Sequence, residues 1–147
     1  MKVLLAIDDS TFSEAATQMI IQEMRPDSTE VRVVHAVPLS LPNEALKQAK
    51  GLVVRAEQVL GKAGFKASSE VLEGDPGAAV THYAVRWHAD LIVVGSHGRT
   101  GLQRLVMGSV AESIARHTHC SIEIVRPSAG RSQGQRTPRQ QKGTMAL

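Results

Sequence analysis

The sequence lacks the cysteine pairs, long apolar runs and N-terminal signal that are typical of disulfide-bonded, membrane and secreted proteins. Cys120 is the only cysteine among 147 residues, so no internal disulfide can form, and such cysteine usage is typical of a reducing compartment. No apolar run reaches membrane-spanning length, and the opening MKVLLAIDDS turns acidic too early for a signal peptide. We therefore expect a cytoplasmic protein without a membrane segment, long enough to fold without disulfides or metals.

Acidic residues are absent from the C-terminal end of the chain. From Arg126 onward there are five basic residues and no acidic one, whereas the preceding residues carry 12 basic and 14 acidic side chains. The net charge of +3 therefore comes from this end, which is rich in Gln, Arg, Gly, Ser and Pro and cannot bury enough apolar surface to fold. We predict one domain over residues 1–127 and a disordered basic tail over 128–147. Nucleic-acid binding, which a basic protein can favour, is expected to be weak at most and confined to this tail.

Two common nucleotide motifs are also missing: neither G-x-x-x-x-G-K-[ST] nor G-x-G-x-x-G after the first strand occurs. A different glycine pattern follows the apolar run 91–94: Gly95 and Gly98 are followed, after nine intervening residues, by Gly108 and Ser109. Glycine lets an anion approach the backbone closely, and the start of the following helix favours negative charge. Ser109 could cap that helix or bind a phosphate oxygen. The same glycines could instead only turn the chain from strand to helix.

Apolar and turn residues alternate along the chain in a strand–helix order. Residues 2–7, 31–37, 66–72, 91–94 and 121–125 are predicted strands. Helices are predicted from 11 to about 24, from 42 to about 60, from 76 to 87 and from 109 onward, with Thr11 and Glu14 at capping-box spacing and Asp75 as an N-cap. This alternation predicts a parallel α/β sheet with helices on both faces.

The glycine pattern, read as GSHG, nine residues and GS, resembles the nucleotide-binding signature of the universal stress protein family, in its ATP-binding-motif subgroup. The segments VLLAIDDS, SEAA, VVHAV, GDP and DLIVVG lie where that family would place them, and the resemblance covers residues 1 to about 127. It implies a Rossmann-like, open, five-stranded parallel sheet of order 3-2-1-4-5. In such sheets ligands bind beyond the carboxyl ends of the strands where the order reverses, here between strands one and four.

The resemblance further implies ATP, with or without Mg²⁺, as the ligand, and assigns backbone and side-chain roles to residues at this switch point. The implied binding residues are Asp8, Ala36, Gly95, Gly98, Gly108 and Ser109. Asp8 would bind a ribose hydroxyl or a hydrated Mg²⁺, although it could also be a turn acid or a helix cap. Ala36 would present backbone groups to adenine.

Other polar and aromatic residues are interpreted from charge and place alone. Arg99 and Arg104 could neutralise phosphate charge or lie in a solvated loop. His97 is interpreted as a loop hydrogen-bonding residue, and Tyr83 and Trp87 as core residues without a basic groove around them. His88, His117 and His119 are interpreted as surface residues, because no carboxylate or cysteine accompanies them at ligand spacing.

The predicted function is that of a regulatory ATP-binding homodimer whose subunits pair through the strand Ser121–Val125, as the resemblance implies. No dedicated catalytic base is visible, so we predict slow or no ATP hydrolysis. Two alternatives stay open: a ligand-free interaction module of the same fold, and a related adenine-nucleotide hydrolase.

Overall fold

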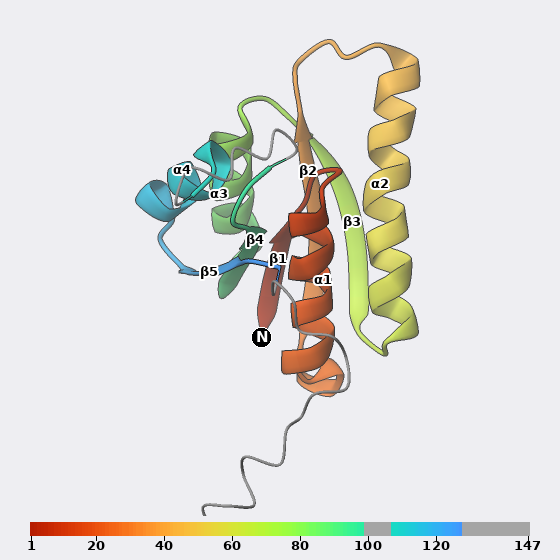
Figure 1. Ribbon diagram of the computed structural model, residues 1–147, viewed down its shortest axis with the longest axis vertical. Helices are drawn as coiled ribbons and strands as arrows, with labels where there is room; N and C mark the ends of the chain where they lie inside the picture. Colours follow the sequence, from red (N-terminus) through yellow and green to blue (C-terminus); the bar gives the residue numbers. More distant parts are fainter. Residues whose placement is uncertain (99–106, 128–147) are drawn as a thin grey trace, which may run out of the picture.

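The computed structural model describes residues 1–98 and 107–127, which form one five-stranded sheet with helices on both sides (Figure 1). All neighbouring strands are parallel and their order is β3-β2-β1-β4-β5, which confirms the predicted topology. The strands are β1 (Lys2–Ala6), β2 (Glu30–Val37), β3 (Lys66–Glu73), β4 (Leu91–Gly95) and β5 (Ser121–Val125). The predicted tail, 128–147, lies outside the described residues and stays a prediction.

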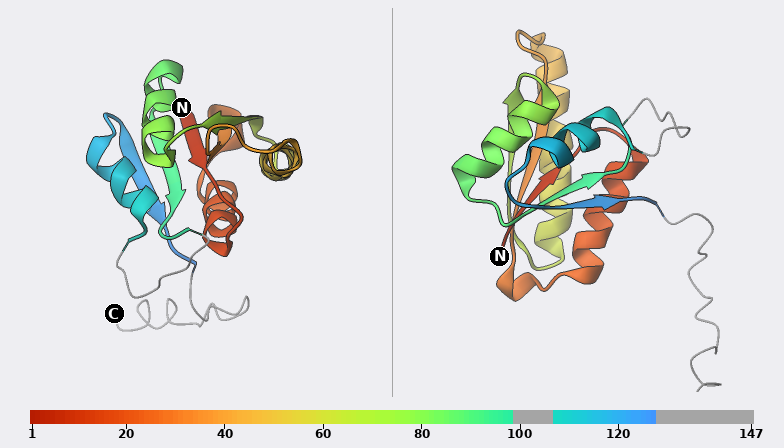
Figure 2. Two further views of the ribbon diagram at one scale, coloured as in Figure 1. Left: turned by 90° about the horizontal axis from the view of Figure 1, so that it is seen from above. Right: turned by 90° about the vertical axis from the view of Figure 1, so that its left-hand side faces the viewer.

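Two helices cover each face of the sheet (Figures 1 and 2). α1 (Thr11–Glu23) and α2 (Asn43–Lys62) pack on one face, and α3 (Pro76–Trp87) and α4 (Ser109–His117) pack on the other; a short 3₁₀ turn, η1 (Pro26–Ser28), follows α1. Alternate residues of β1 supply both cores: Val3 and Leu5 face α1 and α2, whereas Leu4 and Ala6 face α3 and α4. A strand buried on both faces is apolar throughout, which explains the unbroken run at the N-terminus.

Side chains cap two of the helices. The Asp75 carboxylate accepts the Ala78 N–H at 3.0 Å, as the sequence predicted for the start of α3. At α1 the cap is Ser10, whose Oγ accepts the Ser13 N–H at 3.3 Å. The predicted capping box beginning at Thr11 is therefore wrong by one residue. Ser10 has the extended backbone that directs a capping hydroxyl toward the third helical N–H, whereas Thr11 is already helical.

The aromatic side chains of α3 meet cations that the sequence did not place there. Tyr83 is buried, as predicted, and its hydroxyl accepts a hydrogen bond from Arg32 Nη1 at 2.9 Å and donates one to Glu70 at 2.8 Å. Arg32 and Lys2 lie over the Trp87 ring at 4.8 and 5.3 Å from its centroid. Burial raises the pKa of Tyr83 above its ordinary value of 10.0. The cations reach these rings because β1 and β2 begin beside the C-terminal end of α3.

Candidate functional site

The site begins where β1 ends and the chain turns into α1. The Asp8 N–H donates to Ser13 Oγ at 2.8 Å, and the same hydroxyl donates to Asp8 Oδ1 at 2.9 Å. Ser13 is buried in the first turn of α1, so this reciprocal pair is held against the helix. The Asp8 carboxylate is thereby oriented by a residue five positions later in the chain.

The two ends of the glycine loop meet at the carboxyl end of β4. Ser96, which is fully buried, donates its N–H to the Val125 carbonyl at 2.8 Å and accepts the Gly108 N–H at 2.6 Å. The His97 ring packs on Phe12 of α1 with 5.2 Å between ring centroids, and Ser96 Oγ lies 3.0 Å from His97 Nδ1. Residues 99–106 lie outside the described residues, and with them the predicted contributions of Arg99 and Arg104.

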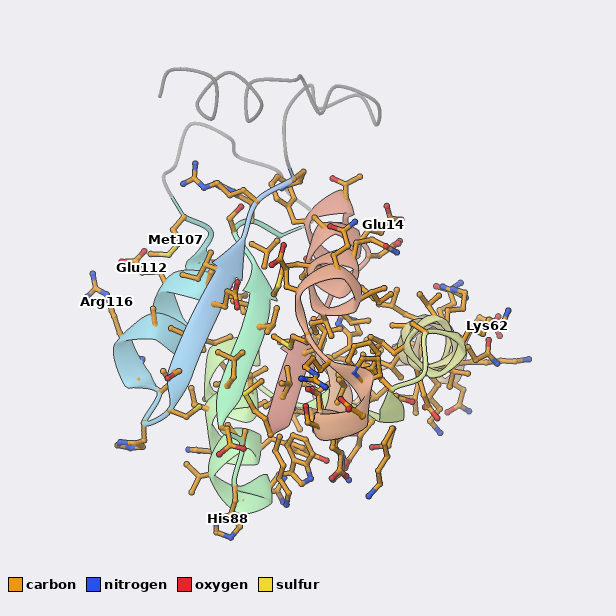
Figure 3. All side chains as sticks on the ribbon, turned by 90° about the horizontal axis from the view of Figure 1, so that it is seen from below. Glu14, Lys62, His88, Met107, Glu112 and Arg116 are labelled. Atoms are coloured by element: carbon orange, nitrogen blue, oxygen red, sulfur yellow. The ribbon has the colours of Figure 1, made fainter. Side chains whose placement is uncertain are left out.

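A cleft of about 410 Å³ opens at this end of the sheet, between the carboxyl ends of β1 and β4 and the starts of α3 and α4. Its volume falls within the range of ligand pockets, roughly 300–1,000 Å³. In Figure 3 the labels Glu14 and Met107 mark this end of the molecule, and His88, the C-cap of α3, lies at the opposite end. The predicted site residues that line the cleft are Asp8, Ala36, Gly95, Gly98, Gly108 and Ser109.

The cleft has one apolar wall and one polar wall. The apolar wall consists of small side chains from the sheet and from α3 and α4, namely Ala6, Val34, Ala36, Val80, Val94 and Ala111. On the polar side lie Asp8, Ser13 and the backbone of the glycine loop. A planar apolar group and a polar or anionic group of the same ligand could thus be held side by side.

The three glycines of the predicted motif have different reasons to be glycine. A Cβ on Gly98 would lie 2.9 Å from Asp8 Oδ2, so its backbone is directly beside the carboxylate. A Cβ on Gly108 would lie 3.0 Å from His97 Cα and 3.2 Å from the Ser96 carbonyl, where the two ends of the loop touch. A Cβ on Gly95 would lie 2.8 to 3.0 Å from Phe12 Cβ, C and O, so Gly95 allows α1 to pack against β4.

The start of α4 points unpaired backbone donors at the cleft. Gly108 is the N-cap and provides no side-chain hydrogen bond, whereas α1 and α3 carry side-chain caps. The first N–H groups of a helix have no partner within it. Those of Ser109, Val110 and Ala111, all residues of the cleft lining, therefore stay available to an anion. The interpretation of Ser109 as a cap is wrong, because Ser109 is the first helical residue and is exposed.

Several residues of the cleft were not predicted as site residues, among them Ser13, His35, Pro76, Val80, Val110 and Ala111. The predicted starts of the helices at Pro76 and Ser109 are confirmed. In a parallel sheet the helices begin at its carboxyl edge, so the predicted helix starts could have identified Pro76, Val110 and Ala111 as residues of the cleft. Nothing in the sequence paired Ser13 with Asp8.

Within the described part of the chain, no three His, Cys, Asp or Glu side chains are grouped so that they could hold a metal ion. Of the helices the structure describes, none has the length and apolar character needed to cross a membrane.

A Rossmann-like sheet with a cleft at its switch point defines a class of ligand-binding α/β domains, and comparison with known proteins gives the family. The model of the universal stress protein family matches residues 1–126. The chain therefore belongs to the universal stress protein family. Universal stress protein MJ0531 of Methanocaldococcus jannaschii is 30% identical over 138 residues, which are 85% of this chain and 81% of that protein.

Solved structures share the fold. The structure of protein MJ0577 superimposes with a TM-score of 0.80 at 24% identity, over 86% of this chain and 96% of that one. An Archaeoglobus fulgidus universal stress protein, solved in complex with dAMP, gives 0.71 at 22% identity, over 85% and 97% of the two chains. An Arabidopsis thaliana family member with AMP bound gives 0.68 at 17% identity, over 92% and 97%.

Proposed function

We propose that this protein binds an adenine nucleotide in the cleft, with ATP as its physiological ligand. The observation that carries the proposal is that one cleft combines a small apolar wall, an uncapped helix N-terminus and a carboxylate. The apolar wall suits a base, the helix N-terminus suits a phosphate chain, and the carboxylate suits a ribose. The dAMP and AMP complexes of the Archaeoglobus and Arabidopsis relatives support the same class of ligand.

Within this proposal each part of the nucleotide has a counterpart. Phosphates would bind the N–H groups at the start of α4 and the backbone of the glycine loop at Gly98, since glycine lets an anion approach the main chain closely. The ribose hydroxyls would bind the Asp8 carboxylate. The base would lie on the apolar wall, with its edge toward the backbone of Ala36. Arg99 and Arg104 remain proposed phosphate partners on charge and sequence position alone.

Mg²⁺ would enter with the nucleotide. Mg²⁺ in nucleotide sites is commonly held by one or two carboxylates together with phosphate oxygens and water. Asp8 is the carboxylate among the described residues that line the cleft, and it lies beside Gly98 at the proposed phosphate position. Asp8 would hold the ion through a bound water, as the alternative to binding a ribose hydroxyl.

The proposed nucleotide site belongs to a homodimer that pairs through β5. The Val125 carbonyl points toward β4, because it accepts the Ser96 N–H. Backbone groups alternate direction along a strand, so those of Ile122 and Ile124 point to the open edge. An unpaired edge of this kind invites a second strand, and a second copy of the same strand would satisfy it.

We further propose that the protein is regulatory and turns ATP over slowly or not at all. Efficient hydrolysis needs a group that orients the attacking water. The Asp8 carboxylate is bonded to Ser13, and the His97 ring is packed between Phe12 and Ser96. Measuring steady-state phosphate release tests this part, since rapid release would favour the adenine-nucleotide hydrolase.

Titration calorimetry with ATP and AMP, with and without Mg²⁺, tests the binding proposal. In Gly98→Val the new side chain would occupy the space beside Asp8, so affinity should fall more than tenfold, or more than about 1.4 kcal/mol. Gly61→Ala is the matched control, because its Cβ meets nothing within 4 Å and lies outside the cleft. Equal affinity in wild type and Gly98→Val would contradict the site, and no binding by wild type would favour the ligand-free module.

A further inference from the structure

At the cleft, the hydrogen-bond ladder between β1 and β2 departs from the regular parallel pattern. The Ile7 N–H donates to the Val34 carbonyl at 2.9 Å, which continues the parallel ladder by one residue beyond β1. In a regular parallel ladder the Ile7 carbonyl would next accept the N–H of the residue two positions after Val34, which is Ala36. It accepts instead from His35 Nδ1, at 2.8 Å.

This bond assigns the proton on the His35 ring. A backbone carbonyl can only accept, so Nδ1 carries hydrogen both when the imidazole is neutral and when it is charged. Ile7 is buried, and an unpaired carbonyl there would be costly. The His35 side chain therefore replaces the Ala36 N–H as the donor to Ile7.

This replacement affects the backbone N–H and C=O groups of Ala36. Its N–H and C=O point to the same side as those of Val34, because backbone groups of alternate strand residues face the same neighbour. On that side β1 has already ended, since the next residue, Asp8, gives its N–H to Ser13 and turns toward α1. Ala36 lines the cleft at this point.

We infer that His35 is a positioning residue for the nucleotide base. By satisfying the Ile7 carbonyl, it ends the ladder early and keeps the donor and acceptor of Ala36 open to the base edge. Adenine offers an amino donor next to a ring nitrogen acceptor, which one residue's C=O and N–H can match. The inference rests on the proposed nucleotide site, although its effect on the Ala36 backbone exists without ligand.

Two variants of the full chain test it. His35→Ala frees the Ile7 carbonyl to pair with the Ala36 N–H. His35→Asn keeps a donor, because an asparagine Nδ2 can take the place of imidazole Nδ1. His82→Ala, at an exposed histidine on α3 outside the cleft lining, is the matched control.

Amide hydrogen exchange of the ligand-free protein, followed by NMR, gives the first readout. The Ala36 amide should exchange rapidly in wild type, His35→Asn and His82→Ala, and at least tenfold more slowly in His35→Ala. A slowly exchanging Ala36 amide in ligand-free wild type would overturn the inference. If His35→Ala does not fold, wild type and His35→Asn still decide the matter by this measurement.

Calorimetry gives the second readout and separates base from phosphate. His35→Ala should bind AMP about tenfold more weakly than wild type, His35→Asn should retain most of the affinity, and all variants should bind tripolyphosphate equally. Equal AMP affinity in wild type and His35→Ala would overturn the role of His35 toward the base. If wild type binds no AMP, the proposed function fails, whereas the exchange measurement still tests what His35 does to Ala36.

Discussion

Replacing Gly95 by alanine should destabilise the fold, although the spacing of the glycines in the sequence predicts that Gly95 belongs to the phosphate site. The added Cβ would lie 2.8 Å from Phe12 Cβ, 2.9 Å from Phe12 C and 3.0 Å from Phe12 O. Carbon atoms pack at about 3.5–4.0 Å, so α1 would have to move by about 0.7 Å or more relative to β4. Two of these three atoms are backbone, so a rotamer change cannot relieve the contact.

The magnitude follows from two opposing effects. Overpacking of a core costs roughly 1–3 kcal/mol, and the loss of glycine's freedom in the unfolded chain returns about 0.4–1 kcal/mol. We expect the free energy of unfolding to fall by about 0.5–2 kcal/mol, compared with the roughly 5–15 kcal/mol of a typical domain. Folded Gly95→Ala should still bind AMP, because the new methyl group points at Phe12.

Urea unfolding followed by far-UV circular dichroism measures this change. With a slope of about 2 kcal/mol per molar urea, the midpoint should fall by roughly 0.3–1 M. Gly61→Ala is the control: Gly61 lies within α2 and its Cβ would meet nothing within 4 Å, so stability should rise by up to about 1 kcal/mol. A Gly95→Ala protein with wild-type stability that no longer binds AMP would refute the packing argument and return Gly95 to the ligand site.

Three further predictions concern single contacts. Ser13→Ala should weaken AMP binding severalfold, and in a double-mutant cycle with Asp8→Ala the two effects should be non-additive by about 0.5 kcal/mol or more, because Ser13 acts through the Asp8 carboxylate; simple additivity would contradict that. Burial raises the pKa of Tyr83, the only tyrosine, so the unfolded chain ionises first: its contribution to stability is complete below about pH 10 and is lost as pH rises through the raised pKa. The melting temperature, measured from pH 9 to 11, should therefore fall more steeply with pH in wild type than in Tyr83→Phe. Equal slopes in the two proteins would exclude this linkage. Ile124→Pro removes an outward N–H of β5 and should give monomers in sedimentation, whereas Ile124→Val, which keeps the N–H, should stay dimeric; a dimeric proline variant would place the interface elsewhere.

The sequence by itself determined the elements and the general position of the site. The runs Val3–Ala6 in β1 and Leu91–Val94 in β4 are apolar at every position because these strands are covered on both faces, and this pattern is visible without any tertiary information. The alternation with helical segments predicted a parallel sheet. The family resemblance supplied the strand order, and together they brought Asp8 and the glycine loop to one edge.

Only the tertiary structure decided what individual residues do there. Periodicity is a local property, whereas the contacts that define the roles join distant segments: His35 to Ile7 across 28 residues, and Gly95 to Phe12 where α1 crosses β4. The same spacing that identified Gly95, Gly98 and Gly108 as one motif could not tell a packing glycine from one beside a carboxylate. That distinction depends on which atoms lie within about 3 Å of the position that a Cβ would take at each glycine, and the close packing of distant segments decides it.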